Sequence, residues 1–334
     1  MMETLKKLFF VFLCCLLIES TVTAQDIHSS DFYTTVVNLN PALTGDFQGN
    51  RRYIAAYRWQ YGTVTVPFQT FTASCDFKKT NRKTHHIGFG ILLNYDKTGD
   101  SRFTSIQFGI PFAFHQLSHS KKQLYSFGLL PQIIYNSIDY SDLQFGDQFI
   151  TDHFYETVKT KDILANNSIN YFNLTTGING TFIITKESIG RIGFAIGNVT
   201  SPVISFDANK SSILSRRYCL HGTYQYRIGN WTDVVPSVKF QYQGAHREFQ
   251  YGGKLMYYLD NRTIPMINIG CWYRSRDRDA LILNAGMNIN NYIVGINYDI
   301  NMSGLSKVSY GQGALEFTLV YIYNKSRMPH KFES

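Results

Sequence analysis

From residue 51 onward the chain falls into short segments in which apolar and polar side chains alternate. In the first segment Tyr53, Tyr57 and Trp59 share one face, while Arg58 and Gln60 share the other. A period of two is typical of a β-strand, whose successive side chains point to opposite faces. The aromatic face suits contact with lipid, and the guanidinium and amide suit a polar interior. The same arrangement recurs as far as residue 323.

The alternation predicts fourteen strands, and their number carries a topological consequence. A bacterial single-chain outer-membrane barrel has an even number of strands, so that both of its ends lie on the periplasmic side. The three longest connections follow the fifth, seventh and thirteenth predicted strands, which are the positions where outward-facing loops belong. The predicted strands cover about 52–61, 70–77, 87–95, 103–114, 123–138, 172–184, 192–196, 220–226, 238–243, 250–257, 267–274, 281–288, 292–299 and 314–323.

These strands must close into a barrel if they cross a membrane. In hydrocarbon every backbone amide has to find its partner within the protein, so a spanning sheet can have no free edge. We therefore predict an all-β protein, a transmembrane antiparallel β-barrel of the bacterial outer membrane with about fourteen strands. The barrel would occupy residues 51–323, with residues 324–334 as a C-terminal tail and both termini in the periplasm.

Composition agrees with this class. Only 17% of the residues are charged, against about 25% in ordinary soluble domains, and the chain holds 23 tyrosines and 25 phenylalanines. The formal charge of +8 raises the question of nucleic-acid binding. However, basic residues are scattered through turns such as Lys78-Lys79 and Arg82-Lys83. A rim that meets outer-membrane lipids fits this distribution better, and no nucleic-acid partner is predicted.

The first 24 residues predict a Sec signal peptide. Lys6 and Lys7 precede an apolar run, Leu8–Ile18, and Val22-Thr23-Ala24 supplies the residues that a signal peptidase reads. The apolar run is shorter than the roughly 18–20 residues of a transmembrane anchor. A lipoprotein signal is disfavoured because Cys14 stands before Cys15, where a small residue belongs. We expect residues 25–50 to form a periplasmic N-terminal segment.

Ionisable residues lie opposite the apolar rows of several strands, and we expect them to face the lumen. Such groups would cost several kcal/mol on the lipid face but not in a wet or mutually paired interior. Two interpretations stay open: the groups pair with one another to fill the barrel, or some line a path or a partner-binding surface. The predicted lumen-facing residues are Arg58, Asp76, Lys239, Lys254 and Glu316.

Aromatic residues in the long connections are candidates for binding a partner polypeptide, because aromatic side chains dominate protein interfaces. The alternative is that they pack among themselves, and that the N-terminal segment merely plugs the barrel instead of covering it or meeting an anchoring component. The connections are 139–168, 201–217 and 300–313, and the candidates are Phe145, Phe149, Phe206 and Tyr310, with Phe154 and Tyr155 beside them.

The sequence offers no catalytic constellation. His85-His86 has no carboxylates at ligand spacing, and a Gly-x-Ser-x-Gly nucleophile elbow is absent. The three cysteines beyond the signal, Cys75, Cys219 and Cys271, are too widely spaced for a metal motif or a disulfide framework. We therefore expect no enzyme activity, no cofactor and no bound metal.

A family resemblance begins just before the first strand. Asn40-Pro41-Ala42-Leu43-Thr44-Gly45, followed by Tyr57-Arg58-Trp59-Gln60, resembles the opening of the PorP/SprF family of the type IX secretion system. The matching motif residues are Asn40, Pro41, Gly45, Tyr57, Arg58 and Gln60. Similar motifs follow in order at 143–149, 192–197, 217–222, 273–274 and 298–301, so the likeness covers nearly the whole mature chain. The chain departs from the family at Ile196-Gly197-Asn198, where an aromatic-His pair is usual.

The resemblance implies an outer-membrane β-barrel accessory of type IX secretion. It would help the export and surface attachment of a partner protein such as a gliding adhesin. The implied partners are a secreted protein with a C-terminal targeting domain and a periplasmic peptidoglycan-linked secretion component. The alternative function is an outer-membrane porin or hydrophobic-solute channel, which shares every compositional feature.

Overall fold

The structure is a computed structural model, and part of the chain lies outside its described residues. It describes 29–60, 62, 66–82, 84–99, 102–139, 149–150, 153–154, 167–206, 212–275, 280–302 and 310–324. The signal peptide predicted at 1–24, residues 325–334 of the tail predicted at 324–334, and the candidate residues Phe145 and Tyr155 therefore lie outside the described residues. The side chains of Phe149 and Phe154 are also not described.

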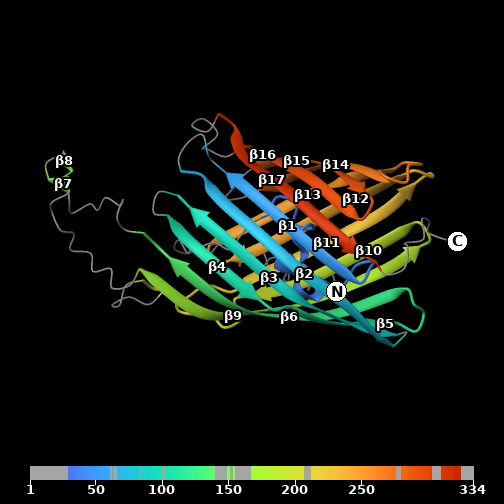
Figure 1. Cartoon of the computed structure of the whole chain (residues 1–334), viewed down its shortest axis with the longest axis horizontal. Helices are drawn as coiled ribbons and strands as arrows, with labels where there is room; N and C mark the ends of the chain where they lie inside the picture. Colours follow the sequence, from blue (N-terminus) through green and yellow to red (C-terminus); the bar gives the residue numbers. More distant parts are fainter. Residues whose placement is uncertain are drawn as a thin grey trace, which may run out of the picture.

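The described residues are almost entirely β-structure, with two short helical turns near the start (Figure 1). No helix among them is both long and apolar enough to cross a membrane. The elements are α2 (Val36–Leu39), η2 (Pro41–Leu43), β1 (Arg51–Gln60), β2 (Phe68–Arg82), β3 (His85–Thr98), β4 (Phe103–Gly109), β5 (Phe112–Leu117), β6 (Gln123–Ser137), β7 (Phe149–Ile150), β8 (His153–Phe154), β9 (Ser168–Thr185), β10 (Ser188–Gly197), β11 (Arg217–Ile228), β12 (Thr232–Gln243), β13 (His246–Tyr258), β14 (Met266–Ser275), β15 (Ala280–Ile289), β16 (Tyr292–Asn301) and β17 (Gln312–Tyr323).

All strands except β7 and β8, which pair with each other in a separate hairpin, form one closed antiparallel sheet. Barrel strands that follow one another along the chain are neighbours in this sheet, β6 being followed by β9, and the sheet closes where β1 pairs with β17. β4 and β5 are two parts of a single barrel strand, since both pair with β3 and β6. With these two counted as one, the described residues make a fourteen-stranded barrel, and the predicted fold is confirmed (Figure 1).

The strand expected over 103–114 is interrupted at residues 110 and 111. The pairing register is unchanged across the break, because Gly109 lies opposite Gln132 and Phe112 opposite Leu129. Pro111 accepts a hydrogen bond from the Gly90 amide but has no N–H of its own to return. The strand is therefore interrupted because backbone hydrogen bonds to the neighbouring strands are missing there, and not because of a β-bulge.

The two faces of the wall have opposite chemistry. Along β1 exposure alternates, so that Tyr57 is 40% exposed while the neighbouring Arg58 is 5% exposed. Large apolar side chains are exposed on nearly every barrel strand, whereas the buried positions are largely Ser, Thr, Asn, Gln and charged residues. This inversion of a soluble protein's pattern is that of a barrel with lipid outside and a polar interior.

The two ends of the barrel carry different connections. We call the end where β1 finishes the loop face; its connections are 61–67, 99–102, 138–167, 198–216, 244–245, 276–279 and 302–311. The opposite end, where β1 starts and β17 finishes, is the turn face; its connections are 83–84, 118–122, 186–187, 229–231, 259–265 and 290–291. All of the longest connections thus lie on the loop face.

Residues 29–50, which we call the plug, pack inside the barrel. From the sequence we expect residues 25–50 to form a periplasmic segment, with a plug of the barrel as the alternative; the described part, 29–50, supplies much of the core. Phe32, Val36, Val37, Leu39 and Leu43 cluster with inward side chains of eight strands. Those wall residues are Ile54, Leu92, Leu130, Ala195, Cys219, Trp272, Ile282 and Val320.

Candidate functional site

The centre of the plug is organised by Asn40, which is fully buried. Its side-chain oxygen accepts a hydrogen bond from the Ala42 amide at 2.9 Å and so caps the short helix η2, where Pro41 stands at the first position. Its side-chain nitrogen donates to the Ile178 carbonyl at 2.9 Å, across to β9. One amide thus both shapes the turn and fixes it to the wall.

Asn40 also meets a buried histidine. The Nε2 atom of His221 on β11 lies 3.1 Å from the Asn40 amide, and its Nδ1 atom lies 3.0 Å from the Tyr33 hydroxyl. Burial raises the pKa of the Tyr33 phenol, so this hydroxyl stays protonated. Two separate parts of the plug are therefore tied to one wall residue.

Three wall glycines give the plug backbone room to approach. A Cβ atom at Gly88 would lie 1.9 Å from the Thr44 carbonyl oxygen, and one at Gly128 would lie 2.3 Å from the Ala42 nitrogen. At Gly177 it would lie 2.1 Å from the Asn40 side-chain oxygen. Any larger residue at these positions would collide with the plug, so these glycines form a cradle for residues 40–44.

The base of the plug, near the turn face, is held by a buried ion pair. Arg52 donates to both carboxylate oxygens of Asp76, at 2.9 and 2.7 Å, and also to the Leu43 carbonyl at 3.1 Å. Asp76 accepts a further hydrogen bond from the Gly45 amide at 2.7 Å. Gly45 has a φ of 77°, which favours glycine at this turn.

The tip of the plug, Ser29–Asp31, is held by a second buried ionic cluster. The Glu316 carboxylate accepts hydrogen bonds from the Ser30 amide at 2.9 Å and from the Ser29 hydroxyl at 3.1 Å. Ser30 also donates its hydroxyl to Asp299 at 2.7 Å and contacts Arg58. Asp299 in turn accepts from Arg58 at 2.9 Å and from Arg274 at 2.7 Å.

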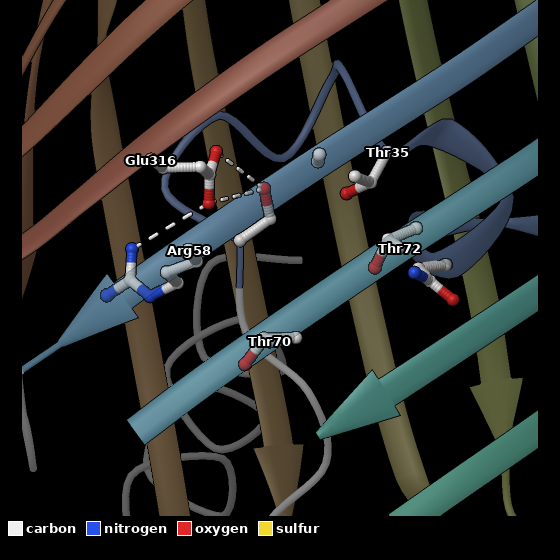
Figure 2. Close-up of a pocket in the computed structure, with 8 residues that line it drawn as sticks. Thr35, Arg58, Thr70, Thr72 and Glu316 are labelled. Atoms are coloured by element: carbon white, nitrogen blue, oxygen red, sulfur yellow. Dashed lines mark hydrogen bonds and ion pairs between the residues drawn. The ribbon is translucent and has the colours of Figure 1, made fainter. Parts of the chain in front are cut away.

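A small pocket lies beside the tip, and Figure 2 shows Arg58 and Glu316 directed toward one another at its edge. Thr35 from the plug and Thr70 and Thr72 from β2 line its other side. The space open to water is about 20 Å³, which accommodates a water molecule. The pocket is thus much smaller than the several hundred Å³ of a typical small-molecule site.

The five residues expected in the lumen fall into separate groups. Arg58 and Glu316 lie 3.8 Å apart at the tip, and Asp76 lies at the base. Lys239 forms an ion pair with Glu248 at 2.5 Å, and its ammonium sits 5.4 Å from the centre of the Phe32 ring. Lys254 is half-buried, paired in register with Val235 and Gly270.

Several residues of the site were not singled out from the sequence as lumen-facing. Asp299 and Arg274 complete the tip cluster, while His115 and His221 hold the plug backbone and Asn40. The sequence feature that could have identified them as lumen-facing is their position opposite a row of apolar residues, as with Asp299 between Tyr298 and Ile300. Nothing local in the sequence indicates which of these polar residues meet.

The loop-face aromatic candidates are not gathered into one cluster by the described residues. The Phe206 ring packs edge-on against the Phe103 ring of β4, with 6.4 Å between the ring centres, so it contacts the rim of the barrel. Tyr310 is 91% exposed. Phe149 has a described backbone, which pairs with that of Phe154 in the β7–β8 hairpin.

The described part of the chain contains no group of three or more His, Cys, Asp or Glu side chains placed to hold a metal ion. Its three cysteines, Cys75, Cys219 and Cys271, are free thiols.

Comparison with known proteins gives one family and a set of similar barrels. The family model described as "Type IX secretion system membrane protein PorP/SprF" matches residues 21–321. No curated protein matches the chain. Among solved structures, the Ralstonia pickettii toluene transporter TbuX has a TM-score of 0.52 at 10% identity, covering 90% of this chain and 95% of that one. The CymD monoaromatic hydrocarbon channel has a TM-score of 0.53 at 9% identity, covering 87% and 93%. At such low identity the likeness shows the barrel fold alone.

Proposed function

The chain belongs to the PorP/SprF family of type IX secretion system membrane proteins, and from this premise we propose that it is a non-enzymatic accessory that helps export and attach a partner protein at the cell surface. Its fold and family make it an outer-membrane barrel of this secretion system. Within that system, it binds polypeptides and does not conduct small solutes.

The observation that carries this proposal is the filled lumen. Five apolar plug side chains are buried against the wall, and burying each contributes about 1.5–3 kcal/mol. Pulling the plug out would also remove the hydrogen bonds that buried Asp76, Asp299 and Glu316 accept from Gly45 and Ser30, which is unfavourable because a buried acceptor would lose its donor. The plug is therefore a fixed part of the barrel at equilibrium, and a solute has no ready path through it.

A hydrophobic-solute channel is the second candidate function. It is favoured by the fold-level likeness to a toluene transporter and a monoaromatic hydrocarbon channel. That likeness concerns the wall of the barrel and not the plug inside it. One fold can also host many functions. The ionic and hydrogen-bonded contacts along the plug weigh against this candidate.

The proposed partners act at the two ends of the barrel. A secreted protein with a C-terminal targeting domain would meet the loop face, where Phe206 and Tyr310 lie. A periplasmic peptidoglycan-linked component would meet the turn face, where β17 ends. In this orientation the C-terminal end of the barrel is periplasmic.

Secretion and solute uptake can be measured side by side in the native host. One strain lacks the protein, a second carries it with residues 203–213 replaced by a short Gly-Ser linker, and a third carries Trp231→Ala on the turn face. We expect the first two strains to lose surface display of one particular secreted protein, with uptake of a small hydrophobic solute unchanged. Trp231→Ala serves as the matched control for loss of an exposed aromatic residue and should secrete normally.

Barrel assembly in each strain is checked by the heat-dependent gel mobility of the folded protein. Intact secretion in the first two strains together with reduced solute uptake would contradict the proposal and favour a channel.

A further inference from the structure

Arg51 lies on the outer wall of the barrel, at the turn-face end of β1. It is exposed, and its guanidinium lies 5.8 Å from the centre of the Phe77 ring and 5.6 Å from the centre of the Tyr323 ring. The register places these rings on either side of it, Phe77 on β2 and Tyr323 at the end of β17 (Figure 1). Two outward-facing aromatic side chains therefore hold this cation against the wall.

The aromatic row continues along the wall at the same level. Phe77 stacks on Phe89 of β3, with 5.2 Å between the ring centres, and Phe89 is paired in register with Phe112 of β5. On the other side of Arg51, the rings of Tyr53 and Tyr321 lie 6.0 Å apart. Belts of aromatic residues mark the level at which a barrel wall passes from hydrocarbon into lipid headgroups. Arg51 therefore lies at headgroup level.

Lys79 is a second cation on this part of the wall. It is exposed on β2, two residues beyond Phe77, and so stands diagonally across from Arg51 on the same outward face. Diagonal neighbours on paired strands are about 7–8 Å apart, which is within reach of two long side chains. Both cations can thus contact one ligand. Among the described residues, neither Arg51 nor Lys79 makes an ion pair with a carboxylate.

The remaining outward strand positions at the turn face are uncharged. Those with described side chains carry no other permanent charge, and many are exposed tyrosines, such as Tyr226 on β11, Tyr257 on β13 and Tyr292 on β16. Among the strand residues at this end, positive charge on the lipid-facing wall is therefore concentrated on β1 and β2.

From this geometry we propose that Arg51 and Lys79 bind the phosphate of a phospholipid headgroup at the turn face. The short connections of this face are typical of the periplasmic side of a bacterial barrel, where the leaflet of the outer membrane is built of phospholipids. A guanidinium donates two parallel hydrogen bonds to phosphate oxygens, and the ammonium adds a second positive charge. With two cations and no carboxylate, the site prefers a lipid of net negative charge to a zwitterionic one.

This lipid site does not depend on the proposed role in secretion. Its location on the outer wall identifies the occupant, because a side chain at headgroup level on a membrane barrel faces lipid.

Native mass spectrometry of the protein purified from the outer membrane tests the site. The parent, Arg51→Gln, Lys79→Gln and the double variant are titrated in detergent with phosphatidylglycerol, and with phosphatidylcholine of the same chain length for comparison. We expect the parent to bind its first phosphatidylglycerol more tightly than phosphatidylcholine. Each single substitution should weaken phosphatidylglycerol binding about fivefold, and the double substitution about 25-fold.

Arg247→Gln is the matched control. Arg247 faces outward on β13 at the loop face, and its guanidinium lies 5.7 Å from the centre of the Tyr242 ring, so it too is a cation held against an aromatic ring. This variant should bind the first phosphatidylglycerol as tightly as the parent. Folding of every variant is checked by heat-dependent gel mobility.

Three results would each overturn the proposal: equal affinity of the parent for the two lipids, unchanged phosphatidylglycerol binding in the double variant, or an equal loss in Arg247→Gln. The preference of the parent is measured without any substitution, so it tests the site even if a variant does not assemble.

Discussion

At the scale of single residues, Asp299 and Asp76 set the position of the plug. Each carboxylate is buried and accepts hydrogen bonds from at least one arginine and from a plug group, Ser30 at the tip or Gly45 at the base. Charge-assisted bonds of this kind are roughly twice as strong as neutral ones, and a buried charge left without its partner is costly. Replacing either carboxylate would therefore weaken the contacts that hold the corresponding end of the plug.

We predict that Asp299→Asn destabilises the barrel by about 3–5 kcal/mol, because Arg58 and Arg274 would both lose the buried carboxylate to which they donate, and Glu316 lies farther from Arg58, at 3.8 Å. The measurement is reversible urea unfolding in detergent or lipid. Asp139→Asn is the matched control, since Asp139 pairs at 3.5 Å with Arg102 in an exposed position. That control should cost less than about 1 kcal/mol, and equal losses in the two variants would contradict the prediction.

The glycine cradle gives a second prediction. Gly88→Ala should cost about 1–3 kcal/mol and leave residues 40–45 more open to protease, because its Cβ atom would lie 1.9 Å from the Thr44 carbonyl oxygen. Gly222→Ala is the control, since a Cβ there meets its nearest neighbour, the Arg191 carbonyl oxygen, at 3.4 Å. If both variants resist protease as the parent does, the wall glycines do not position the plug.

At the scale of elements, the wall has a local weakness where prolines on two adjacent strands interrupt the backbone hydrogen bonds, Pro131 opposite Ile110 and Pro111 opposite Gly90 of β3. Ile110 donates to the Pro131 carbonyl at 3.1 Å, but neither Pro131 nor Pro111 can return a bond. Strand pairing continues on both sides in the same register, so the surrounding sheet holds these residues in place.

We expect Pro111→Ala to join β4 and β5 into one strand, because the new amide faces the Gly90 carbonyl across the ladder. The new amide hydrogen should exchange as slowly as those of neighbouring strand residues, as measured by NMR or mass spectrometry. The net stabilisation should not exceed about 1 kcal/mol, since a hydrogen bond gains that much and the loss of proline's stiffness offsets part of it. Exchange as fast as that of an exposed turn would show that the break has another cause.

At the scale of the whole molecule, the barrel and its plug form one folding unit. The core is built between plug residues 32–43 and inward residues of eight strands, so neither part buries its apolar interior without the other. The closed sheet satisfies its own backbone, while the plug occupies the lumen that the sheet encloses.

We predict that removing residues 29–45 opens the lumen. In planar lipid bilayers the parent protein should conduct little current, and the shortened protein should form stable pores. Folding of the shortened barrel is checked by its heat-dependent gel mobility. If the barrel fails to assemble, Gly88→Ala offers a milder displacement of the plug and should raise the frequency of brief openings. Equal, large conductance in the parent and in either variant would show that the plug does not close the lumen.

The alternation along the chain is enough to predict the barrel wall. The period of two places Tyr57 outside and Arg58 inside within a single strand, and this alternation needs no knowledge of the neighbours. Fourteen strands and the position of the long connections followed from counting such segments. Boundaries were less exact: β2 runs from Phe68 to Arg82, well beyond the expected 70–77, because alternation fades where a strand leaves the apolar layer.

The filling of the barrel, by contrast, depends on contacts between distant parts of the chain. Residues 29–50 have no alternation that shows where they pack, and the contacts that hold them join distant parts of the chain. Arg58 meets Asp299, 241 positions away, and Ser30 meets Glu316, 286 positions away. Such pairs come together only when β1 closes on β17, since closure brings the inward faces of all strands around one lumen. Local pattern shows that a side chain points inward, but the partner it finds there is set by the shape of the closed barrel.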